Sequence, residues 1–202
     1  MAVLMARGDH RADLRGFFAP FNYTWTDRTE HVSTWRAALE GMAYPRPGLS
    51  RHLVHKAVCF ASGWTVVLDP ELLMFAEEAP CTALATRLGA PVFGAVCEGT
   101  SATYGFSYFN PDRQRSFLVS DSEVQEDVGT PLEAEAGIAT AALFEDDVLL
   151  IMKRVGVDYL SFEGLRDFVV VELDESHLGV AAPETLPATT APTPLRPWWK
   201  FW

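Results

Sequence analysis

The spacing of apolar residues changes along the chain, and the first regular pattern is helical. Four apolar residues recur at intervals of three and four, the spacing of one helical face: Val32, Trp35, Leu39 and Met42. The pattern predicts a helix here, within an N-terminal helical section of about residues 9–42. The cluster "YPRPGLS" that follows predicts a loop.

Short β-type runs dominate the middle of the chain. The segment "HLVHKAVCFASGWTVVLD" holds two such runs separated by Ser62-Gly63, which suits a tight hairpin turn because glycine adopts positive φ easily. Three more strands are predicted in "PVFGAVCEG", "ATYGFSYF" and "QRSFLVSD". The run "DFVVVELD" predicts a strand near the centre of the sheet, because it is continuously apolar.

Three further segments predict helices. The first runs from an N-cap at Asp69 to Gly89, with a kink or break at Pro80. The second is "TPLEAEAGIATAALF", which begins with a capping box that uses Glu133. The third, "DDVLLIMKRVG", ends at Gly156, although a strand is also compatible with its short apolar run.

Helices and strands alternate without a regular βαβ repeat, and several strands are linked as hairpins. The sequence therefore predicts an α+β fold with an antiparallel or mixed sheet flanked by helices. We expect one domain over residues 1–177. Residues 178–195 are rich in Pro, Thr and Ala and predict an extended linker.

The last segment, residues 196–202, reads "RPWWKFW" and combines aromatic with basic side chains. Its candidate partner-binding residues are Arg196, Trp198, Trp199, Lys200, Phe201 and Trp202. Three interpretations stay open: the segment folds back on its own domain, docks into another protein, or binds a membrane interface. A docking peptide of this kind suits a cargo or adaptor protein that joins a shell or a larger assembly.

The charge of the chain is strongly acidic, with 27 Asp and Glu against 16 Lys and Arg. This imbalance disfavours a nucleic-acid partner. Residues 116–152 contain no Lys, Arg or His and nine carboxylates. They are either a solvated face or a docking surface for a basic protein partner. The candidate contact residues are Asp121, Glu123, Glu126, Asp127, Asp146 and Asp147.

Neither a secretion signal nor a membrane-spanning run is predicted. The N-terminal segment carries charges where a signal peptide needs apolar residues, and no apolar run approaches the ~20 residues of a transmembrane helix. We expect the three cysteines to be reduced and buried in a cytoplasmic protein. The oligomeric state is left open.

No catalytic signature is present, and we expect no cofactor. As a metal site we consider His52, His55 and Cys59, which are weak candidates. Residues at this spacing share one face only on a helix, and here a strand is predicted. The alternative of an enzyme requires a site assembled from scattered groups, among them His52, His55, Cys97 and Glu98. A structural subunit of a larger assembly is a third possibility.

Residues 55–136 resemble small uncharacterised bacterial proteins of the immunity type. The resemblance is carried by "GWTVVLDPELL" and by "YGFSYFNPDRQRSFLVSDSEVQEDVGTPLEAE". The matching positions are Trp64, Tyr104, Phe106, Arg115, Gly129, Pro131, Leu132 and Glu135. The resemblance implies a protein that binds a cognate toxin, frequently through an acidic face. Together these observations predict a non-catalytic protein-binding module.

Overall fold

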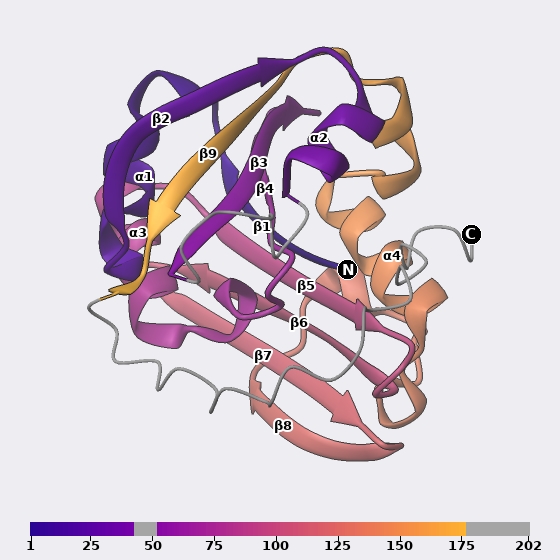
Figure 1. Ribbon diagram of the computed structural model, residues 1–202. Coiled ribbons are helices and arrows are strands. Elements are labelled where there is room, and N and C mark those ends of the chain that lie inside the picture. Colours follow the sequence, from indigo (N-terminus) through magenta and orange to yellow (C-terminus); the bar gives the residue numbers. More distant parts are fainter. Residues whose placement is uncertain (43–51, 177–202) are drawn as a thin grey trace, which may run out of the picture.

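The computed structural model describes residues 1–42 and 52–176. Within them a single antiparallel sheet has the strand order β2-β9-β3-β4-β1-β5-β6-β7-β8 (Figure 1). The strands are β1 (Ala2–Arg7), β2 (Thr24–Val32), β3 (Leu53–Ala61), β4 (Trp64–Leu68), β5 (Val92–Glu98), β6 (Thr103–Asn110), β7 (Arg113–Ser120), β8 (Glu123–Gly129) and β9 (Phe168–Asp174). The expected α+β fold is confirmed, and of the two predicted sheet types, antiparallel or mixed, the antiparallel one forms.

Helices cover both faces of the sheet and make three layers. They are α1 (Leu14–Phe18), α2 (Trp35–Met42), α3 (Glu78–Leu88) and α4 (Glu145–Val155). Shorter 3-10 turns are η1 (Arg11–Asp13), η2 (Ala19–Phe21), η3 (Met74–Ala76), η4 (Glu133–Glu135), η5 (Thr140–Ala142) and η6 (Tyr159–Gly164). The front layer contains α2 and α4, and the back layer contains α1 and α3 (Figure 1).

The core consists of two apolar layers separated by the sheet. In β1, Val3 and Met5 face the front layer, whereas Leu4 and Ala6 face the back layer. Successive side chains of a strand point to opposite faces, so a strand covered on both sides must be apolar throughout. This explains the continuous apolar sequence of β1, which is the middle strand of the nine.

Four sequence-based expectations need correction. The strand predicted near the centre of the sheet, β9, lies next to the edge strand β2. The helical section predicted over residues 9–42 contains the strand β2, and α2 begins only at Trp35. The segment from Asp69 forms turns, so α3 begins at Glu78 and Pro80 lies in its first turn without breaking it. The "TPLEAEAGIATAALF" segment forms only the two short turns η4 and η5.

The two edges of the sheet are β2 and β8, at the top and bottom of Figure 1. In the described ranges neither strand has a second neighbour. Strand β8 carries a run of acidic side chains and follows a tight turn at Asp121 and Ser122, both with positive φ. None of the helices in these ranges is long and apolar enough to cross a membrane.

Candidate functional site

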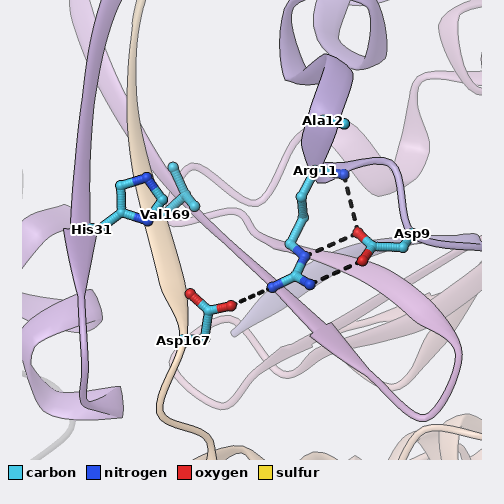
Figure 2. Close-up of a pocket in the computed structure, with 6 residues that line it drawn as sticks. All are labelled: Asp9, Arg11, Ala12, His31, Asp167 and Val169. Carbon is cyan, nitrogen blue, oxygen red and sulfur yellow. Dashed lines mark hydrogen bonds and ion pairs between the residues drawn. The ribbon is translucent and has the colours of Figure 1, made fainter.

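A pocket with a volume of about 400 Å³ lies at the β2 side of the sheet (Figure 2). It is lined by Asp9, Arg11, Ala12, His31, Asp167 and Val169. Arg11 begins η1, Asp167 precedes β9, and His31 lies on β2 opposite Val169. The pocket therefore joins the end of β1 to the outer two strands.

Both carboxylates of this pocket bind the guanidinium of Arg11. Its Nε and one terminal nitrogen each donate to Asp9 at 2.9 Å, and the other terminal nitrogen donates to Asp167 Oδ2 at 2.5 Å. The guanidinium also lies over the Phe60 ring at 5.4 Å from its centroid. Because Arg11 is held from three sides, it acts as a clamp between two segments and is a poor ligand for an external anion.

The electrostatics of the clamp agree with this interpretation. The hydrogen bonds that Arg11 donates lower the pKa of Asp9, while the bond to Asp9 is the main cause of the raised pKa of Arg11. With two carboxylates against one guanidinium, the pocket carries a net negative charge when His31 is neutral. It contains neither a thiol nor a hydroxyl group that could act as a nucleophile.

A fully buried lysine lies in the back layer. Lys56 Nζ contacts Asp69 Oδ1 and Glu71 Oε2, each at 2.6 Å, and lies 5.3 Å from the centroid of the Tyr23 ring. Asp69 also accepts from the backbone N–H groups of Leu73 and Met74, so it fixes the loop after β4. A charge buried without a partner is very unfavourable, and this cluster supplies the partners. Its role is therefore structural.

A second buried cation lies in the front layer near β8. Arg115 donates to both carboxylate oxygens of Glu135, at 3.0 and 2.8 Å. It also donates to Asp127 Oδ1 at 2.5 Å and to the carbonyl of Val128 at 3.1 Å. Glu135, and not the predicted Glu133, accepts from a backbone N–H of its own turn, that of Leu132 at 2.6 Å. One side chain thus joins β7, β8 and η4.

The three thiols, of which Cys97 was the catalytic candidate, are buried and protonated at neutral pH. Burial raises the pKa of Cys59 and of Cys97 to about 12, and it also raises that of Cys81. Cys97 belongs to β5, which is separated from β3 and its histidines by β4 and β1. The structure does not bring the scattered groups His52, His55, Cys97 and Glu98 together as one site.

The weak metal candidates do not form a site either. His55 Nε2 lies 3.5 Å from Glu172 Oε2, and both side chains are buried. His55 and Cys59 are four residues apart on β3, and His52 precedes that strand. Across the ranges that the structure describes, no three His, Cys, Asp or Glu residues are grouped so that they could hold a metal ion.

The predicted acidic residues divide into two groups. Four of them lie on β8 or in the turn before it: Asp121, Glu123, Glu126 and Asp127. Of these, Asp127 forms an ion pair with Arg115. Asp146 and Asp147 lie in the first turn of α4, where Asp147 accepts from the N–H of Phe144 at 3.1 Å. Carboxylates are favourable at a helix N-terminus, which accounts for part of this charge.

An apolar row connects these two groups, and we call it the edge strip: Tyr104, Val119, Val124 and Phe144. Val119 is buried and Tyr104 half-buried, so only the other two are exposed. Cross-strand pairing places Tyr104 next to Val119 and Val119 next to Val124. The ring of Phe144 packs on that of Tyr104, with centroids 6.0 Å apart. Phe144 is 60% exposed and Val124 46% exposed. The strip thus crosses β6, β7 and β8 from the start of α4 to the edge of the sheet.

Sequence reasoning found the carboxylates of this surface but missed its apolar part. Strand β8 was not predicted, so Val124 had no assigned neighbour, and Phe144 was placed inside a helix that does not form. The aromatic residues 196–202 and the linker 178–195 lie outside the described residues. Comparison with protein-family models, with curated proteins and with solved structures gave no match.

Proposed function

We propose that the protein is a non-catalytic binding module whose edge strip docks a basic segment of another protein. The observation that carries the proposal is the exposure of two apolar side chains, Phe144 and Val124, near carboxylates of β8 and of the first turn of α4. An immunity-type protein or an adaptor would use such a surface. The buried thiols suit a reducing compartment such as the cytoplasm.

The apolar part of the strip supplies affinity. Phe144 and Val124 leave apolar surface in water, and a partner that packs on them would remove that surface. Aromatic side chains in such positions are frequent anchors of protein interfaces. Tyr104 and Val119 beneath them are held by the sheet, so the surface is already ordered before a partner binds.

The charge around the strip selects the partner. Residues 116–152 supply no Lys, Arg or His, and Arg115 compensates only Asp127 and Glu135. Glu123 and Asp146 remain exposed, and no ion pair of theirs occurs among the described residues. The negative electrostatic field of these carboxylates accelerates the approach of a basic partner and disfavours an acidic one.

The outer edge of β8 adds backbone groups that a partner can use. An edge strand presents N–H and C=O groups on its outer side, and an extended segment can pair with them as an additional strand. The proposed partner segment is therefore extended and basic, with apolar side chains on one face.

The proposal is tested by charge reversal at the strip. The wild type is used to capture binding proteins from a lysate at low salt. We expect the double variant Glu123→Lys and Asp146→Lys to capture less of these proteins. The variant Glu78→Lys and Glu163→Lys, which changes two exposed carboxylates elsewhere, should retain them. Captured proteins would be compared by quantitative mass spectrometry. If both variants captured the same proteins as the wild type, the edge strip would not be the binding surface.

A further inference from the structure

We propose that the buried side chains of Lys56 and Asp69 react with each other and form an intramolecular amide cross-link without another enzyme. The reaction joins the amine of the lysine to the carboxyl group of the aspartate and releases one water molecule. It takes place in the back layer, so it is independent of the edge strip and of the proposed binding function.

The sheet holds the two reacting groups against each other. Pairing of β3 with β4 sets Ala57 opposite Leu68, and one residue further along it sets Lys56 opposite Asp69. Lys56 Nζ lies 2.6 Å from Asp69 Oδ1, and both side chains are fully buried. Two reactants held in contact by a rigid framework react as if each were present at a very high concentration.

The two oxygens of Asp69 lie in different surroundings. Oδ2 accepts hydrogen bonds from the backbone N–H groups of Leu73 and Met74, both at 2.8 Å. When Nζ attacks the carboxyl carbon, negative charge develops on an oxygen, and two fixed N–H donors stabilise such a charge. Oδ2 therefore stays as the carbonyl oxygen of the new amide, and Oδ1, which contacts Nζ, is the oxygen that leaves.

Glu71 is placed to carry the protons. Its Oε2 lies 2.6 Å from Lys56 Nζ. It takes one proton from the ammonium group, which frees the lone pair of the nitrogen, and passes this proton to Oδ1. The bond between Nζ and the carboxyl carbon forms, a second proton of Nζ follows the same route, and Oδ1 departs as water. The third proton stays on the amide nitrogen, so the two side chains carry no net charge before or after the reaction.

The ion pair is the resting state, and it makes the reaction slow. Burial alone would lower the pKa of Lys56, but the attraction of Asp69 outweighs burial and raises that pKa. Burial would likewise raise the pKa of Asp69, and the attraction of Lys56 lowers it. The neutral amine is therefore scarce. The product is favoured because a neutral amide replaces two charges in the interior, where charges are poorly solvated.

A second lysine–aspartate pair in the same chain supplies an internal control. Lys153 Nζ lies 2.8 Å from Asp158 Oδ2, and the two side chains are 63% and 38% exposed. Water solvates both charges there, so the ion pair is not replaced by a neutral amide. We expect no cross-link at this pair.

The proposal is tested by intact-mass spectrometry of the full chain, denatured after a long incubation in the folded state. We expect a mass lower than that of the sequence by one water molecule. Lys56→Arg keeps the positive charge but has no reactive amine, and it should show the full mass of its sequence. Glu71→Gln should form the cross-link more slowly by about 100-fold or more. Glu78→Gln, which changes an exposed carboxylate, should behave as the wild type.

Digestion with chymotrypsin locates the bond, because cleavage after Phe60 and Trp64 separates Lys56 from Asp69 in the sequence. A branched peptide that contains both residues is expected. The proposal is wrong if the folded wild type keeps its full mass, or if Lys56→Arg also loses one water molecule. It is also wrong if digestion assigns the loss to a cyclic imide at one aspartate or to the pair Lys153 and Asp158. The decisive measurement uses the wild type, so misfolding of a variant cannot imitate either result.

Discussion

The two edges of the sheet differ in how their charges are balanced. Strand β2 carries Asp27, Arg28, Glu30 and His31, so acids and bases alternate within the strand itself. Strand β8 carries three carboxylates and no base. Charged residues on an edge strand prevent uncontrolled pairing with other chains, and both edges meet that requirement. With His31 neutral, β2 has a net charge of −1 and β8 one of −3, so β8 leaves the larger charge that a partner could neutralise.

The attachment of the two edges also differs. Arg28 lies 3.6 Å from Glu172 Oε2 with a side chain that is 72% exposed, so the pair is screened by water. Arg115 is buried and forms a network with Glu135, Asp127 and the backbone of β8. The acidic edge is therefore fixed by a strong internal contact. A rigid position allows its remaining carboxylates to serve as a recognition surface.

The largest expected effect on the free energy of unfolding comes from comparing the removal of Arg115 with the removal of Arg28. Arg115→Ala leaves Glu135 buried without its partner and should lower the free energy of unfolding by about 3 kcal/mol. Arg28→Ala should lower it by less than about 1 kcal/mol. Urea denaturation of both variants measures the difference. Equal losses would show that the two edges are held alike and would remove the basis of the comparison.

A smaller loss of stability is expected from a substitution at Gly129, the last residue of β8, where the backbone approaches Gln114 closely. Gly129 has φ +83°, and a Cβ there would lie 2.1 Å from the carbonyl oxygen of Gln114. Gly129→Ala should destabilise the protein by about 2–3 kcal/mol because strain and a backbone clash combine. Gly89→Ala, at φ +58° with no atom within 4 Å, should cost about 1 kcal/mol.

Hydrogen exchange separates the local from the global consequence of the Gly129 substitution. Amides of β7 that pair with β8 should exchange faster in Gly129→Ala than the loss of global stability alone explains. Those of β1, four strands from that edge, should accelerate only by the factor that this global loss sets. Equal stability of Gly129→Ala and Gly89→Ala would contradict the close backbone approach at the end of β8.

Much of the sheet could be predicted from the sequence, because alternation and hairpin turns are local signals. The hairpin at Ser62-Gly63 forms as expected, with positive φ at both residues, and α4 ends at Gly156 as predicted. Strand β2 was mistaken for helix, because its long-range pairing with β9 outweighs a local helical spacing. Strand β8 was missed because its polar residues lack any apolar alternation.

The sites were harder to predict because they depend on contacts between distant segments. The Arg11 clamp joins residues 156 positions apart, and nothing in the local sequence indicates that distance. Lys56 offered one usable signal, since a lysine within the apolar run "HLVHKAVCF" must find buried partners. The carboxylates of β8 were recognised from composition, whereas the apolar row beside them required the pairing of three strands.

The smallest expected effect concerns pH and the clamp on the β2 side. The hydrogen bond from Arg11 lowers the pKa of Asp9 below its usual 3.8. A lowered pKa means that Asp9 stabilises the fold above about pH 4 and that this contribution is lost as the pH falls through the folded value. Asp9→Asn should therefore lower the free energy of unfolding by less than about 1 kcal/mol at pH 7, because the pair is exposed.

That loss should begin to shrink as the pH falls towards 3.8 and should approach zero only below the lowered pKa of Asp9, where the wild-type carboxyl is protonated in the folded protein as well. Asp112→Asn is the control, since Asp112 is exposed and makes no side-chain hydrogen bond or ion pair among the described residues. Urea denaturation of the three proteins at several pH values measures both differences. A loss at Asp9 that stayed constant with pH would mean that the hydrogen-bonding geometry of the side chain, and not its charge, holds the β2 side of the sheet.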